Sequence, residues 1–339
     1  LQRVPVPVSH DKIFFQIRPF IHACQSRRHT QLRLLIGDKG FILHRIARIR
    51  QLMARDQVQA VIIPSGDPHM SEYFSEHWKT RRFVSGFTGS VGTYVITENA
   101  SGLWVDGRYY VQAERQIADS EAVLFRASEP DCPTFSQYLL DNLAPNSVVG
   151  LNGKLFSLSM MEQMQQLFAQ KGITLNIQAD YGNDIWEDRP AEEYTPAYYF
   201  DEKYCGKSAA QKLSEVRDAL AKQGCDALVV GRLDNSNWLF NVRANDIPNS
   251  PIAISYGFVS GDQAVLFTAL SRVSAQAAEQ LAKNGVTLRE YEDIYPFLSS
   301  LQTDAHVLCD PDEVNYLLYN QMQNNSHLTL VKGVDPIPM

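Results

Sequence analysis

The sequence predicts an α/β fold with two tandem domains, each built on a mixed central sheet flanked by helices. Helical and strand patterns alternate along most of the chain, which is typical of α/β architecture. The order then repeats, because residues 49–63 align without gaps on residues 216–230, an offset of 167 residues. With 339 residues, 45% of them hydrophobic, the chain is long enough for two cores.

Composition and charge argue against two classes of partner. The formal net charge is −7, and residues 1–40 carry seven Lys or Arg against two Asp, so this segment is +5 and the remainder is −12. An acidic body argues against a nucleic-acid groove, so we expect no nucleic-acid partner. No apolar run approaches the roughly 18 residues of a membrane span, so we expect no membrane partner.

The cysteines are dispersed and form no CxxC pair. Such spacing suits buried thiols in a reducing compartment better than disulfides or structural zinc, and we expect a cytoplasmic protein. The five positions are Cys24, Cys132, Cys205, Cys225 and Cys309.

Residues 1–40 differ in character from the rest of the chain. They are basic and acid-poor, begin with Leu and show no sustained helix or strand period. A transit peptide has a similar composition, but we favour an upstream translated stretch or a fragment boundary. We expect this extension to be poorly ordered or extraneous.

The first predicted domain, residues 41–188, opens with a helix and a buried strand. Ile46, Ile49 and Met53 lie on one helical face, and the apolar run 60–63 follows. A helix is expected from Tyr110, with Ala113 and Ile117 on one face. The other expected elements are strands over 83–87, 93–97, 103–106, 148–151 and 173–177, and helices over 135–139 and 158–167.

A Pro- and Tyr-rich linker over 189–204 leads to the second predicted domain, residues 205–339. In this copy, strands over 238–242, 265–267 and 307–308 and a helix over 273–281 are expected to match elements of the first. A last helix should follow Asp310 as N-cap, with Pro311 at N1. The copies diverge at one strand end, where Asp106-Gly107-Arg108-Tyr109 is replaced by Thr268-Ala269-Leu270-Ser271.

Two clusters in the first domain allow more than one interpretation. Asp67, His69, Glu72, Glu76 and His77 lie within eleven residues and offer O and N metal ligands. The helical HExxH spacing is absent, however, and a solvated or interface loop is the favoured interpretation.

Glycines recur at positions 86, 89 and 92. They lead into a strand rather than a helix, so close backbone packing is favoured over phosphate binding. The chain has no Gly-x-Ser-x-Gly elbow and no sequence signature of an activated thiol.

Charged residues at either end of this glycine-rich stretch leave alternatives open. Arg81 and Arg82 are either a solvated pair, which we favour, or anion ligands. Asp106 and Arg108 either form a structural salt bridge at a strand end or line a surface that faces a partner subunit's active site.

Five motifs, in order over residues 41–339, resemble the N-terminal half of cytosolic-type aminopeptidase P, an Xaa-Pro aminopeptidase family of the creatinase/prolidase-like superfamily. They are PSGDPH with SEY at 64–73, RRFVSGFTGS at 81–90, WVDGRY at 104–109, IWEDRP at 185–190 and WLFN at 238–241. The resemblance implies two tandem creatinase-N-terminal-like domains. In the family a catalytic "pita-bread" domain follows, which binds two divalent metal ions, usually manganese, and removes an N-terminal residue that precedes proline.

The chain stops at Met339, about where the family's third domain would begin. The resemblance places the metal-binding aspartates, histidine and glutamates in that domain. We therefore expect no catalytic residue, metal ligand or cofactor in this chain, and no activity from it alone, since a two-metal hydrolase needs converging carboxylates.

The resemblance also implies that first-domain loops help form a homodimer and shape the mouth of the active site for peptides with proline at the second position. The candidate substrate-access or interface residues are Asp67, His69, Arg81, Arg82, Asp106, Arg108 and Tyr109. The alternative hypothesis is a complete, non-catalytic binding or scaffold module built from the duplicated domain.

Overall fold

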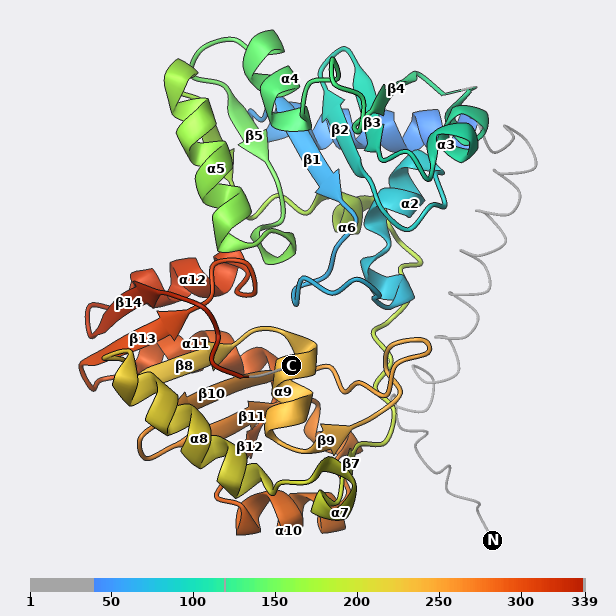
Figure 1. The fold of residues 1–339 in the computed structure, drawn as a ribbon. Coiled ribbons are helices and arrows are strands. Elements are labelled where there is room, and N and C mark those ends of the chain that lie inside the picture. Colours follow the sequence, from blue (N-terminus) through green and yellow to red (C-terminus); the bar gives the residue numbers. More distant parts are fainter. Residues whose placement is uncertain (1–39, 119, 338–339) are drawn as a thin grey trace, which may run out of the picture.

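The computed structural model describes residues 40–118 and 120–337, which form two α/β domains, each with a six-stranded mixed sheet (Figure 1). The first sheet contains β1 (Ala60–Pro64), β2 (Thr93–Thr97), β3 (Ser101–Val105), β4 (Ala122–Arg126), β5 (Val148–Gly150) and β6 (Thr174–Asn176). The second contains β8 (Ala227–Val230), β10 (Tyr256–Ser260), β11 (Ala264–Phe267), β12 (Thr287–Arg289), β13 (Ala305–Cys309) and β14 (Leu328–Lys332).

The two sheets share one topology. Their strand orders are β4-β3-β2-β1-β5-β6 and β12-β11-β10-β8-β13-β14. In each, the strand that follows the first long helix pairs antiparallel on one side and parallel on the other. The predicted α/β class and its duplication are therefore confirmed.

Helices cover both faces of the first sheet. A helix over residues 40–55 lies on one face with α2 (Thr80–Ser85), α3 (Tyr110–Ile117) and α6 (Tyr181–Ile185), and α4 (Phe135–Asn142) and α5 (Leu158–Phe168) lie on the other. Strand β1 serves both cores, because Val61 and Ile63 pack with the first set of helices while Ala60 and Ile62 pack with the second. Such alternation is expected of a strand that is buried on both faces, because successive side chains point to opposite sides of the sheet.

The second domain repeats the arrangement. One face of its sheet carries α8 (Ala209–Lys222), α9 (Leu233–Leu239) and α10 (Ala275–Lys283), and the other carries α11 (Ile294–Ser300) and α12 (Tyr316–Gln323). Strand β8 divides its side chains as β1 does: Leu228 and Val230 face one core, and Ala227 and Val229 face the other. The offset of 167 residues therefore preserves the direction of each side chain as well as the order of elements.

Three local predictions are wrong. Residues 83–87 do not form a strand, because α2 occupies 80–85 and ends at Gly86, whose φ of 74° is the left-handed conformation that ends helices. A window of five residues is too short to distinguish the helical period of about 3.6 residues from the strand period of about 2. Likewise, 238–242 splits into the end of α9 and the short strand β9 (Val242–Arg243).

The predicted N-cap of the last helix is the third error. Helix α12 begins at Tyr316, and Asn315 is its N-cap, with a side chain that accepts from the Leu318 amide at 3.0 Å. The Asp310 carboxylate instead accepts from the amides of Asp312 and Asp335, and residues 311–313 form a turn before the helix. Strands β4, β10, β12 and β14 were not predicted.

The segment between the domains, predicted as a linker over 189–204, is held closely to the second domain. Its strand β7 (Tyr198–Tyr199) pairs antiparallel with β9, and α7 (Glu202–Cys205) follows. Thr195 donates both its amide and its hydroxyl to Asp246 at 2.9 Å. The predicted basic extension lies outside the described residues except for residue 40, which begins a helix.

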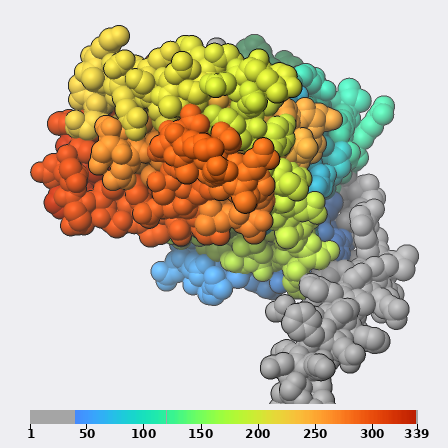
Figure 2. Space-filling view, turned by 90° about the horizontal axis from the view of Figure 1, so that it is seen from below, coloured from blue at the N-terminus to red at the C-terminus, as the bar shows by residue number. Residues whose placement is uncertain are grey.

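The domains contact each other through α5 and the segment around α12 (Figure 1). Ser157 and Asn315 form an antiparallel bridge, Gln165 donates to the Tyr316 hydroxyl at 2.8 Å, and Lys154 pairs with Glu292 at 3.2 Å. From below, the yellow-to-red second domain covers most of the visible face, and the blue start of the first domain appears at its margin (Figure 2). Within the described ranges, no helix is long and apolar enough to cross a membrane.

Candidate functional site

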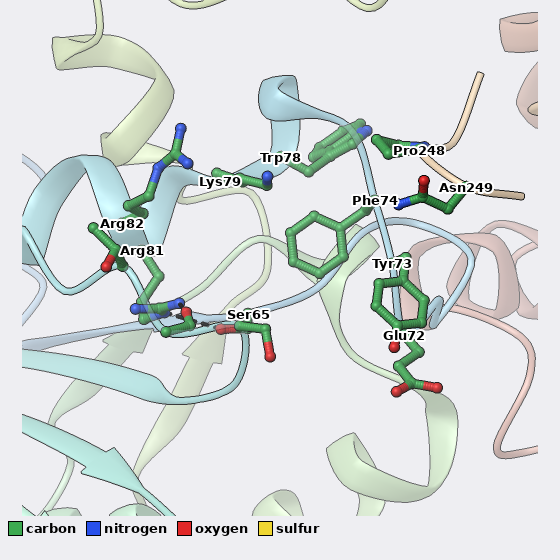
Figure 3. Close-up of a pocket in the computed structure, with 13 residues that line it drawn as sticks. Ser65, Glu72, Tyr73, Phe74, Trp78, Lys79, Arg81, Arg82, Pro248 and Asn249 are labelled. Carbon is green, nitrogen blue, oxygen red and sulfur yellow. Dashed lines mark hydrogen bonds between the residues drawn. The ribbon is translucent and has the colours of Figure 1, made fainter. Parts of the chain in front are cut away.

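A pocket of about 190 Å³ lies where residues 65–90 of the first domain face residues 248–249 of the second (Figure 3). One wall is aromatic and consists of Tyr73, Phe74 and Trp78. The pocket is therefore lined by part of the glycine-rich stretch, including Gly89 of its three recurring glycines, together with the polar loop that precedes it.

The side of the pocket opposite the aromatic wall is basic. It is formed by Lys79, Arg81 and Arg82, which come from the start of α2 and the residue before it (Figure 3). Lys79 and Arg82 each form an ion pair with Glu76. The favoured interpretation of the two arginines as a solvated pair is wrong for Arg81, which is only 4% exposed.

Arg81 is held by oxygen atoms that carry no formal charge. Its Nε donates to Ser65 Oγ at 2.9 Å, Nη1 donates to the Phe87 carbonyl at 2.7 Å, and Nη2 donates to the Gly89 carbonyl. Burial lowers the pKa of the guanidinium to about 10, so it remains protonated at neutral pH. Among the described residues no carboxylate pairs with it.

The aromatic wall is fixed by the segment between the domains. Trp78 Nε1 donates to Glu192 at 2.8 Å, and the Arg189 guanidinium lies over the indole ring at 5.1 Å. His77 Nδ1 bonds the Pro190 carbonyl at 2.8 Å. Trp78 and the adjacent His77 are therefore held in place by residues more than 100 positions later in the chain.

The diverged strand end lies at the rim of this pocket. Tyr109 exchanges a 2.6 Å hydrogen bond with Ser90, which lines the pocket, and a Cβ on Gly89 would lie 2.8 Å from the Tyr109 ring. This contact supports the close-packing interpretation of Gly89.

Asp106 and Arg108 form a two-point ion pair, with Nε to Oδ1 at 2.9 Å and Nη2 to Oδ2 at 2.8 Å. The hydrogen bond from Arg108 lowers the pKa of the Asp106 carboxyl. The Arg108 side chain is 66% exposed, so the pair offers charge to solvent. Neither residue lines the pocket. Their role toward a partner subunit stays a prediction.

Asp67 and His69 do not reach the pocket. Both are buried, with exposures of 3% and 1%, and His69 lies at the contact between the domains. Asp67 Oδ1 accepts from the amides of His69 at 3.1 Å and Ser71 at 2.9 Å, which closes the loop on itself. Burial raises the pKa of Asp67 to about 6.

His69 joins the first domain to the second. Its Nδ1 lies 2.7 Å from the Gly231 carbonyl, and its Nε2 lies 2.8 Å from the Tyr291 hydroxyl. Because a carbonyl only accepts, Nδ1 carries the proton and Nε2 accepts from Tyr291. Burial lowers the pKa of the ring to about 4, so the imidazole is neutral at pH 7. The ring also packs against Tyr256, with centroids 4.2 Å apart.

The described residues do not fit a dinuclear metal centre. Nowhere in residues 40–118 or 120–337 do three His, Cys, Asp or Glu side chains converge as metal ligands. The acidic and histidine residues of the 67–77 loop have separate partners. Asp67 bonds amides of its own loop, His69 bonds the second domain, and Glu76 pairs with Lys79 and Arg82.

Several residues of the site were missed by sequence reasoning. Phe74, Trp78 and Lys79 form an aromatic and basic run inside a polar loop, and this local pattern is a signal that could have found them. Pro248 and Asn249 belong to the other domain and have no such signal.

Family comparisons agree with the duplicated fold. A model described as the creatinase/prolidase N-terminal domain matches residues 45–179, and a second model with the same description matches residues 188–339. The chain belongs to this family and contains two creatinase/prolidase N-terminal domains.

Curated relatives of these creatinase/prolidase N-terminal domains are aminopeptidases. Aminopeptidase P2 of Arabidopsis thaliana is 36% identical over 85% of this chain, and a probable Xaa-Pro aminopeptidase P of Laccaria bicolor is 35% identical over 76% of it. In each case the match covers 40% of the relative's length.

A solved structure also has this architecture. The X-prolyl aminopeptidase of Caenorhabditis elegans superposes with a TM-score of 0.80 at 26% identity, over 86% of this chain and 50% of that one. That protein is described as a cytosolic enzyme with a di-nuclear active site.

Proposed function

We propose that this chain is the N-terminal portion of a cytoplasmic, metal-dependent Xaa-Pro aminopeptidase, which removes the residue before proline from the N-terminus of peptides. The observation that supports the proposal most directly is the ordered match of both domains to aminopeptidases of this kind, across 85% of the chain. Two divalent metal ions, of which manganese is the expected one, would belong to the part of the intact enzyme beyond these two domains.

In this proposal the two domains support dimerisation and restrict access to the active site. The exposed Asp106–Arg108 pair and the neighbouring Val111, which is 63% exposed, offer a mixed polar and apolar edge for a partner subunit. Within residues 40–118 and 120–337 no ligand set assembles, and the proposal therefore assigns the metal ions to the rest of the intact enzyme.

The test has two arms. The reading frame after codon 339 is determined, and the 339-residue chain and any longer product are each incubated with an Arg-Pro-Pro peptide and Mn²⁺. We expect a downstream Asp, Asp, His, Glu, Glu set, release of arginine by the long product only, and loss of that activity with a chelator. A frame without that set would favour a non-catalytic scaffold module. Turnover by the 339-residue chain would contradict its assignment as inactive alone.

The dimer role is tested on the long product. Arg108→Glu places like charges at positions 106 and 108 and should weaken self-association measured by sedimentation equilibrium. Arg126→Glu, a change at a half-exposed arginine paired with Glu114, is the control. Equal association of both variants and the parent would remove this edge from the proposed interface.

A further inference from the structure

Arg81, which lines the pocket of Figure 3, is a buried cation without an anionic partner among the described residues. The proposed function does not explain this arrangement, because it assigns peptide cleavage to another part of the enzyme. Arg81 is 4% exposed, yet its three protein acceptors are one hydroxyl and two carbonyl oxygens. A charge removed from water is stabilised well only when an opposite charge compensates it.

Arg81 also has N–H groups that donate no hydrogen bond to the described residues. A guanidinium has five N–H groups. Three hydrogen bonds to protein, one from each nitrogen, account for three of them. Two N–H groups therefore have no acceptor within the described part of the chain, although the side chain lines an open pocket.

The charge around the pocket favours a monoanion. Lys79, Arg81 and Arg82 supply three positive charges, and Glu72 and Glu76 supply two negative ones. Glu192 and Arg189, which both contact Trp78, cancel each other, so an excess of one positive charge remains. A carboxylate matches this excess, whereas a phosphate dianion would exceed it. Carboxylates are also the common partners of arginine in charge-assisted hydrogen bonds.

The rest of the pocket fits a small apolar body beside the anion. Phe74 and Trp78 provide flat aromatic surface, and Pro248 closes the pocket from the second domain (Figure 3). Tyr73 is 62% exposed next to them. The volume of about 190 Å³ is below the roughly 300–1,000 Å³ of pockets for drug-sized ligands. The space therefore suits a group the size of one amino-acid residue.

We propose that this pocket binds a small organic carboxylate with an apolar or aromatic body, the chemistry of a peptide's C-terminal residue, with Arg81 as the anion-binding group and Phe74 and Trp78 as the apolar wall. The site goes beyond the proposed function, because binding by the 339-residue chain requires no catalytic domain. Failure of either proposal leaves the other standing.

The experiment titrates the 339-residue chain with N-acetyl-phenylalanine by calorimetry, with N-acetyl-phenylalaninamide and inorganic phosphate as matched probes. We expect the acid to bind and the amide to bind at least about tenfold more weakly, since it lacks the charge that arginine recognises. Absence of acid binding, or amide binding within about threefold, overturns the proposal. Tighter binding of phosphate than of the acid also overturns it.

Variants locate the site. Arg81→Gln should bind the acid and the amide with equal affinity. Phe74→Ala should bind the acid more weakly than the parent does but should still prefer the acid to the amide. Arg126→Gln, outside the pocket, should bind as the parent does. Circular dichroism reports folding, and if Arg81→Gln does not fold, Phe74→Ala decides. Parent-like binding by a folded Arg81→Gln, or by Phe74→Ala, overturns the assignment.

Discussion

The domain contact depends on His69 to an extent that a single substitution measures. His69→Ala removes both side-chain hydrogen bonds and leaves two buried groups, the Gly231 carbonyl and the Tyr291 hydroxyl, without their partner. Each unsatisfied group costs about 1–3 kcal/mol. The lost ring contact with Tyr256 adds about 0.5–1.5 kcal/mol. We expect the free energy of unfolding to fall by about 3–7 kcal/mol, since the surrounding structure relaxes only partly into the cavity that the ring leaves.

Urea unfolding of the 339-residue chain, followed by circular dichroism, measures this loss. The matched control is His306→Ala, whose ring is 57% exposed and, within the described part of the chain, pairs with the exposed Asp226, so its effect should stay within about 0.5 kcal/mol. Because two domains can unfold in separate steps, hydrogen exchange at the amide of Ser71 provides a second readout of the contact. A His69→Ala chain as stable as the His306→Ala chain would refute the reasoning.

Three further predictions concern stability. Burial raises the pKa of Asp67 from 3.8 to about 6, so the parent loses stability between these pH values, where the carboxyl ionises in the unfolded chain but stays protonated in the folded one. Asp67→Asn should therefore gain stability relative to the parent as pH rises from 4 to 6, by up to about 3 kcal/mol. Urea unfolding across that range checks this, and a stability difference that does not change with pH would contradict it. Asp246→Ala should cost about 3–5 kcal/mol because it leaves buried Arg272 without its carboxylate, whereas exposed Asp262→Ala should change little in the same assay. Gly86→Ala should lower the melting temperature by several degrees, since φ at this position is 74°, and an unchanged melting temperature would contradict the strain.

The fold was predictable because the hydrophobic pattern survived duplication. Residues 60–63 and 227–230 keep the same alternation toward two cores, so a gapless alignment of 15 positions was enough to predict two copies of one domain. Short segments were less certain. Residues 80–85 form a helix whose buried positions, such as Arg81 and Val84, follow helical spacing that five residues do not reveal.

The site was predictable only where its residues are close in sequence. Arg81, Arg82 and Tyr109 all belong to the glycine-rich stretch, and the structure brings them to one pocket or its rim. The environment of each arginine was not predictable, because burial of Arg81 depends on Ser65 and on how the chain turns after α2. His69 was placed among possible metal ligands, and only the second domain shows that its ring nitrogens are already occupied.

The two copies use charge at the end of their equivalent strands in opposite ways. After β11, Arg272 is buried and bonds Thr268 and Asp246, and Asp246 in turn holds the segment between the domains through Thr195. After β3, the cation is Arg108, which aligns with Leu270 rather than with Arg272. It is exposed and, among the described acidic residues, pairs with Asp106 two positions before it. A charge used inside one copy is thus unavailable for recognition, whereas the charge in the other copy is displayed beside the pocket. The strand end of the first domain is therefore the one from which contact with another molecule is expected.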